Sequence, residues 1–243
     1  MTDEGRQFHQ VLAREIPRLH ALAYLATGSR AAALAALRDV AAHATVEVLA
    51  AASPESALLG CLVRTLREES GRRSSWTFEA LDDRLRAEVS LPVNVAAPPI
   101  DGDLRRLPVL VAEVQRSCLV AALSCLPPAV RFAFLLVDVL GQPESFALEV
   151  LETTPVSLET RRRRARKRLA DYLGPRCGHV ARRNPCSCEG RLAVALAEKF
   201  VTLPREPEPP LETGPTENLA ALYRRLLALR PPPLGALVET EDL

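Results

Sequence analysis

Positive charge is concentrated in one short stretch of the chain, where seven of the eight residues from 161 to 168 are arginine or lysine. Side chains of this kind can contact DNA phosphates, and arginine can also form two hydrogen bonds with a guanine. At helical spacing, the apolar side chains around the run share one face: Leu158, Ala165, Leu169 and Tyr172. An amphipathic basic helix is therefore expected at residues 155–173. Taken alone, such a run is equally compatible with a solvated helix that has no specific partner.

A turn in front of the basic helix makes it part of a larger motif. Residues 144–152 predict a short helix, after which Thr154 suits an N-cap and Pro155 the first position of the next helix. Two helices joined by so tight a turn indicate a helix-turn-helix, whose second helix enters the DNA major groove. The sequence thus predicts double-stranded DNA as a partner. The residues expected to contact it lie on the polar faces of the second helix: Ser157, Glu159, Thr160, Arg161, Arg163, Arg164, Lys167 and Arg168.

A group of potential metal ligands follows the basic helix. Three cysteines and one histidine fall within twelve residues: Cys177, His179, Cys186 and Cys188. Asn184 and Pro185 favour a turn between them, so that the two pairs of ligands could face each other. Three thiolates and an imidazole suit tetrahedral Zn²⁺, and Cu(I) or Cd²⁺ would also accept the thiolates. Reduced thiols without a metal are the alternative.

The other candidates for chemistry are weaker. The remaining cysteines, Cys61, Cys118 and Cys125, are expected to be small core residues rather than ligands. The sequence contains no Walker loop, no Gly-rich dinucleotide turn, and neither an HExxH nor a GxSxG motif. We therefore expect that the protein is not an enzyme and has no catalytic residues.

The composition indicates an all-α protein. Apolar residues make up 48% of the chain and are mostly alanine, leucine and valine, whereas aromatic residues make up 4%. Alanine and leucine favour helices, and long β-branched runs are scarce. The net charge of +1 means that any affinity for nucleic acid must come from a local cluster. Because charges interrupt every long apolar stretch and the N-terminus lacks a signal-peptide core, we expect a cytoplasmic protein with reduced thiols and no membrane partner.

Helical periodicity and proline clusters divide the chain into four expected parts. Residues 1–75 form a helical domain, residues 76–107 a Pro-rich linker, and residues 108–174 the helical domain that contains the helix-turn-helix. Residues 175–243 form an extension with the cysteines and histidine, a Pro-rich spacer at 204–215 and an amphipathic helix at 217–230. The sequence thus predicts two small helical domains and a tail.

The sequence around the helix-turn-helix resembles a known family. Residues 126–141, LPPAVRFAFLLVDVLG, are similar to the start of region 4 of extracytoplasmic-function (group 4) sigma-70 factors, and the similarity continues to Leu169. The resemblance implies that the motif reads the −35 element of a promoter and docks on the flap of core RNA polymerase. Two positions depart from the family. Glu152 stands where a small residue, often glycine, is usual, and Arg162 stands where leucine is usual.

Residues 7–73 resemble region 2 of the same family, which grips the polymerase clamp and opens the −10 element. Asp39 falls where a clamp-binding acid is common, which makes it the candidate for polymerase binding. Leu34 and Ala35 replace an acidic pair, and Ala41 stands where an aromatic residue is usual. Opening a promoter needs aromatic faces that stack on unpaired bases, and this part of the chain has few.

The resemblance leads to a sigma-70-like transcription initiation factor, which binds core RNA polymerase and directs it to promoters. Some members carry a similar RCGxxxxxNPCxC stretch after region 4, and cysteine-rich tails of that kind can sense metals. An anti-sigma protein would be a further partner. One alternative is a sigma-derived DNA-binding regulator without promoter-melting activity. Another is a metal-binding interaction module whose basic helix contacts an acidic protein.

Overall fold

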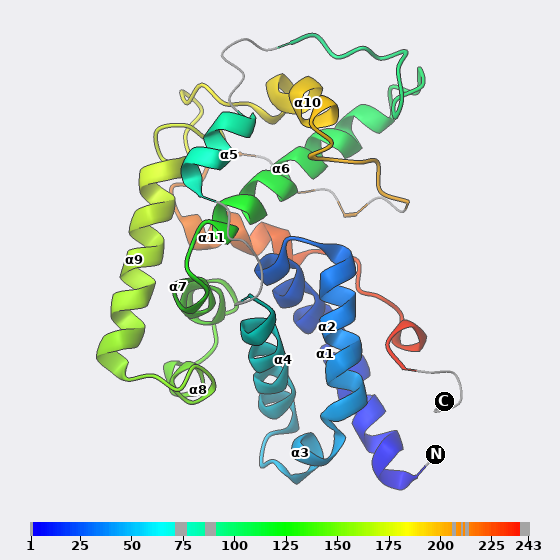
Figure 1. Ribbon diagram of the computed structural model, residues 1–243, viewed down its shortest axis with the longest axis vertical. Helices are drawn as coiled ribbons and strands as arrows, with labels where there is room; N and C mark the ends of the chain where they lie inside the picture. The colour runs from blue at the N-terminus through cyan, green and yellow to red at the C-terminus, as the bar shows by residue number, and fades with distance from the viewer. Residues whose placement is uncertain are drawn as a thin grey trace. The chain divides into compact units, whose positions relative to one another are not determined.

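The computed structural model describes residues 2–70, 77–85, 91–205, 208–209, 211 and 214–238. Within these ranges the chain is mostly helical and has no strand, which confirms the all-α prediction; one isolated bridge joins Cys177 and Cys186 (Figure 1). The chain forms two compact units. Unit 1 comprises Met1–Ser74, Pro127–Arg163 and Leu229–Leu243, and unit 2 comprises Ser75–Leu126 and Arg164–Ala228.

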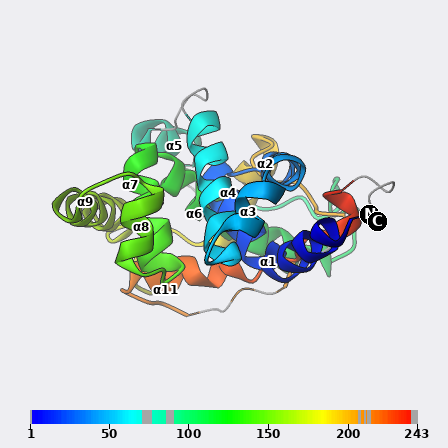
Figure 2. The same ribbon diagram turned by 90° about the horizontal axis from the view of Figure 1, so that it is seen from below.

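Unit 1 is built on three long helices, α1 (Asp3–Thr27), α2 (Arg30–His43) and α4 (Pro54–Ser70), which pack on one another. The short helix α3 (Thr45–Ala50) lies against α1 and α4 (Figure 2). The later part of this unit contains α7 (Pro128–Ala133), the π-helix η1 (Phe134–Val139), α8 (Glu144–Val150) and the first half of α9 (Pro155–Leu173). A 3-10 turn, η3 (Leu234–Ala236), follows near the end of the chain.

Local sequence sets the junction between α1 and α2. The Thr2 hydroxyl caps α1 by accepting from the Gly5 N–H at 3.1 Å, and the helix ends at Gly28, whose φ of 72° is left-handed. Ser29 then caps α2 by accepting from the Ala32 N–H at 3.3 Å. These two residues thus make the break between α1 and α2. Glycine reaches this φ without steric cost, and serine supplies the oxygen that the next helix needs.

Residues 127–139 pack within unit 1 and not within a separate domain. Phe132, Phe134 and Leu136 are completely buried, and α7 contacts α4. The guanidinium of Arg131 is 6% exposed and donates to the carbonyl of Ala26 at the end of α1. Residues 127–139 therefore group with residues 1–74, because α7 packs on α4 and Arg131 binds the end of α1.

Unit 2 centres on α6 (Arg106–Ser124), which packs against α5 (Phe78–Leu85) and α10 (Cys188–Ala197). It also contains the second half of α9, α11 (Leu219–Arg224) and the 3-10 turn η2 (Arg225–Leu227). The helix expected at 217–230 is thus shorter and ends as a 3-10 turn. The α11 segment packs on its own unit, because the Tyr223 hydroxyl donates to the Leu119 carbonyl at 3.1 Å and the side chain is completely buried.

Part of the predicted linker at 76–107 belongs to the core of unit 2. Residues 78–85 form α5, and Ile100 is completely buried with Leu110, Val114 and Leu192. The prolines around Ile100 do prevent a helix there, as expected, but they form turns that return this side chain to the core. Part of the Pro-rich segment is therefore folded here, with Ile100 buried in the core and Val93 packed against it.

The helix α6 is long and apolar enough to cross a membrane by length and composition, with a mean hydropathy of 1.4. Of that window, 56% is buried inside the protein, and a core helix passes the same test. The helix also holds an ion pair between Arg116 and Glu113, with a 2.7 Å separation and side chains that are at most 4% exposed. Length alone therefore does not assign α6 to a membrane.

The turn after α8 places a residue other than glycine at a left-handed φ. Glu152 has a φ of 47° and follows the last turn of α8. A side chain at this φ costs about 1–2 kcal/mol, and a glycine does not have this cost. Glycine would therefore suit this turn better than glutamate.

We expect Glu152→Gly to raise the free energy of unfolding by about 1 kcal/mol and Tm by roughly 2–4 °C. Glu149→Gly is the matched control, because Glu149 is exposed within α8 at a helical φ. This control should lower stability by about 0.5–1 kcal/mol. Thermal and urea unfolding of both variants measure the difference, and destabilisation by Glu152→Gly would contradict the role given to φ.

Candidate functional site

The basic helix α9 forms where the sequence predicts it. Its first turn is capped by Thr154, whose hydroxyl accepts from the Ser157 N–H at 3.3 Å. Leu158, Ala165 and Leu169 are at most 1% exposed, so the expected apolar stripe is buried. With these residues fixed, the remaining faces of the helix carry its charges toward solvent.

The predicted DNA-contacting residues lie on those faces. Glu159, Thr160, Arg163, Arg164 and Lys167 are exposed, and Ser157, Arg161 and Arg168 are half-buried. Lys167 pairs with Asp171 at 2.8 Å. In the part of the chain that the structure describes, four guanidinium groups of the helix make no ion pair: Arg161, Arg163, Arg164 and Arg168. Their charge is therefore available to a ligand.

Arg162 behaves differently from its neighbours. Its side chain is 13% exposed and forms two hydrogen bonds with the Asp138 carboxylate of η1, at 3.1 and 3.3 Å. It also pairs with Glu144 of α8 and with Glu159, the latter at 3.1 Å. Arg162 therefore fixes α9 on η1 and α8 within unit 1.

We expect Arg162→Ala to lower the free energy of unfolding by about 3 kcal/mol, because Asp138 would keep a charge in a nearly buried position without its partner. Arg163→Ala is the matched control, since the neighbouring arginine is exposed and unpaired; it should change stability by less than about 0.5 kcal/mol. Urea unfolding of the two variants tests this. Equal effects would mean that the ion pair does not fix the helix.

The four predicted metal ligands lie in a loop that begins where α9 ends. The backbone pairs Cys177 with Cys186, and the Gly178 N–H donates to the Cys186 carbonyl at 3.0 Å. The side-chain amide of Asn184 donates to the Cys177 carbonyl at 2.9 Å and to the Gly174 carbonyl at 2.7 Å. A Cβ at Gly178 would lie 2.9 Å from the Cys186 carbonyl oxygen, so this close approach requires glycine.

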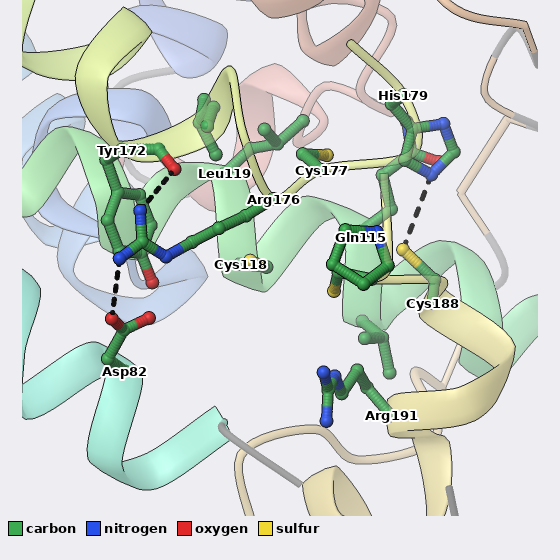
Figure 3. Close-up of a pocket in the computed structure, with 14 residues that line it drawn as sticks. Asp82, Gln115, Cys118, Leu119, Tyr172, Arg176, Cys177, His179, Cys188 and Arg191 are labelled. Carbon is green, nitrogen blue, oxygen red and sulfur yellow. Dashed lines mark hydrogen bonds and ion pairs between the residues drawn. The ribbon is translucent and has the colours of Figure 1, made fainter. Parts of the chain in front are cut away.

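The loop brings the ligands together as two pairs. Cys177 and Cys186 are neighbours through the backbone, whereas His179 Nε2 and Cys188 Sγ lie 3.4 Å apart (Figure 3). Ser187 caps α10, so Cys188 is the first residue of that helix. No three of the His, Cys, Asp and Glu side chains described in the structure are arranged to hold one metal ion. The facing pairs are thus present without a formed metal geometry.

A cavity of about 280 Å³ in unit 2 adds a residue that the sequence did not predict for this site. Cys118 of α6 lines it together with all four loop ligands (Figure 3). Gln115, one helical turn earlier, lines it too. The spacing of Gln115 and Cys118 places both on one face of α6, but no sequence pattern indicates that this face meets the loop.

Burial governs the protonation of the site. It raises the pKa of Cys177 and of Cys188, and the neighbouring thiols add to the shift. Burial also lowers the pKa of His179, and Arg225 acts in the same direction. Near neutral pH Cys177 and Cys188 are therefore thiols and the His179 imidazole is neutral. A metal bound here would have to displace the thiol protons.

Asp39, the predicted polymerase-binding residue, lies in unit 1 on α2. Its side chain is 52% exposed, accepts from the Thr65 hydroxyl at 3.3 Å and lies 3.2 Å from His43 Nδ1. These contacts are at the surface, so they leave the carboxylate accessible to a partner.

Comparison with known proteins identifies no relative of this chain. No family model, no curated protein and no solved structure matches the chain. Function is therefore inferred from the chain's own residues and their arrangement.

Proposed function

We propose that this chain is a sigma-70-like transcription initiation factor, in which α9 recognises the −35 element and other parts of the chain bind core RNA polymerase. The observation that carries the proposal is how the side chains of α9 are disposed. One face is buried, Arg162 is held by acids, and four other arginines project outward without ion pairs to described residues. A fixed helix with free guanidinium groups suits a groove of DNA better than a solvated surface.

The positions along α9 suggest which side chains contact bases and which contact phosphates. Ser157, Thr160 and Arg161 lie near the N-terminus of the helix, which is the end that contacts base edges in helix-turn-helix proteins. Arg164 and Arg168 lie one and two turns further and can reach bases or phosphates. Phosphate contacts supply affinity, and base contacts supply specificity. Asp39 offers polymerase an exposed carboxylate, at the position that the family resemblance indicates.

We expect the double variant Arg161→Ala/Arg164→Ala to bind selected DNA at least roughly 100-fold more weakly than wild type, with unchanged helical content. The DNA would be selected by the wild-type protein from a randomised duplex pool. The matched control is Arg182→Ala/Arg183→Ala, which removes the same charge from two exposed residues outside α9. Fluorescence anisotropy over a range of salt measures both. Equal losses in the two double variants would contradict recognition by α9.

A second candidate function has specific support. The aromatic residues in the described range 2–70 are Phe8 and Tyr24, and they are 1% and 3% exposed. Neither presents a face on which an unpaired base could stack. Trp76, the next aromatic residue, lies outside the described residues. This burial favours a sigma-derived regulator that binds DNA or polymerase without opening the promoter.

Transcription with core RNA polymerase distinguishes the two candidates. The template would be the region upstream of this protein's own gene, in a fully paired form and in a form with mismatches across the −10 region. We expect a discrete transcript from the paired template that requires the protein. A transcript from the mismatched template alone would favour the regulator, because recruitment would be retained and melting lost. No transcript and no binding to the polymerase would contradict both.

The cysteine loop supports a further part of the proposed function. Three thiols and a neutral imidazole lie in or beside one cavity, and Gly178 and Asn184 hold the loop that carries them. We propose that this loop binds Zn²⁺, with Cu(I) or Cd²⁺ as alternatives, and that the metal adjusts the activity of the factor. Cys177, His179, Cys186 and Cys188 are the residues that would hold it.

A further inference from the structure

We propose that Cys118 of α6 takes the place of His179 among the four ligands of this metal, so that four thiolates hold the ion and it links α6 to the cysteine loop. This inference rests on the proposed metal binding by the loop. The four thiols would come from Cys118, Cys177, Cys186 and Cys188. A set of four cysteines is a common tetrahedral zinc site, and it leaves His179 to donate a hydrogen bond to the sulfur of Cys188.

The shared cavity is the first observation for Cys118. The side chains of Cys118 and of the three loop cysteines line one space of about 280 Å³ within unit 2 (Figure 3). A cation bound among the four sulfur atoms would stabilise all of the thiolates together.

The side chain of Gln115 supplies independent support. Gln115 is 5% exposed and lines the same cavity, and its Nε2 is buried without a hydrogen-bond partner in the described structure. A buried amide donor without an acceptor is costly, so native proteins seldom retain one. A thiolate sulfur bound to a metal would be an acceptor for it. The amide therefore points to a hydrogen-bond acceptor that occupies the cavity.

Positive charge in the wall agrees with this interpretation. Four thiolates around a divalent ion carry a net charge of about −2. Arg176, Arg191 and Asp82 line the cavity, and Arg176 pairs with Asp82 at 3.2 Å. The wall thus carries one more positive than negative side chain, which would offset part of the negative charge of the thiolate cluster.

Cys125, at the C-terminal end of α6, is a cysteine with a structural role only. It follows Cys118 by seven residues, is 8% exposed and donates from its sulfur to the Ala121 carbonyl at 3.3 Å. It does not line the cavity that holds the loop thiols. Its thiol is satisfied by its own helix, so it serves as the matched control for Cys118.

The test uses the full chain, reduced and stripped of metal, and titrates it with Cd²⁺ while the thiolate-to-metal absorption is recorded. We expect Cys118→Ser to weaken Cd²⁺ binding by more than the roughly 10–100-fold that is typical of outer-shell changes. It should also remove about one quarter of the absorption, since one of four thiolates is lost. Cys125→Ser should bind as wild type does. Circular dichroism checks that each variant is folded.

A second measurement on the wild-type protein does not depend on the folding of a variant. Thiols are alkylated with and without Cd²⁺, and the labelled peptides are identified by mass spectrometry. We expect the metal to protect Cys118 together with the loop cysteines and to leave Cys61 and Cys125 unchanged. Protection of the loop cysteines alone, with normal binding by Cys118→Ser, would overturn the inference and leave the loop site intact. No Cd²⁺ or Zn²⁺ binding by the wild-type protein would overturn the proposed metal site as well.

Discussion

The ion pair between Arg162 and Asp138 is the constraint on which the candidate DNA-binding surface depends. Both side chains are nearly buried, at 13% and 11% exposure, so each would be costly to bury alone. Glu144 and Glu159 add acceptors to the same guanidinium, which satisfies more of its N–H groups. Because Asp138 lies on η1 and Glu144 on α8, one arginine sets the position of α9 against both elements. The neighbouring Arg163 and Arg164 are left to face solvent.

The same helix surface thus contains charges with opposite roles. Arg162 is directed inward by acids that lie on neighbouring elements, whereas Arg163 and Arg164 meet no such acid and are exposed. Sequence alone gives these residues equal chemistry. Their difference arises from the rotation of α9, which the burial of Leu158, Ala165 and Leu169 determines. Apolar packing therefore decides which guanidinium groups stabilise the fold and which remain for a ligand.

What the sequence could predict is local, and what it missed is long-range. Caps and breaks at Gly28, Ser29 and Thr154 follow from side chains that hydrogen-bond or permit a φ within a few residues. Ile100 and Cys118 could not be placed in the same way. Ile100 lies in a proline turn and Cys118 in an apolar helix, as the local sequence indicates. The residues that surround each of them come from distant parts of the chain. Periodicity shows which face is apolar and does not show which segment covers it.

Binding a duplex and opening one make different demands on this chain. Binding needs positive charge on a fixed helix, and α9 has both. Opening needs exposed aromatic faces, since stacking must replace the base stacking that is lost. Phe8 and Tyr24 of α1 are instead buried in the core of unit 1, where they contribute to its folding. With these two side chains buried, the positive charge of α9 is the feature of the described structure that suits binding. Any melting would then depend on residues beyond these two or on the polymerase itself.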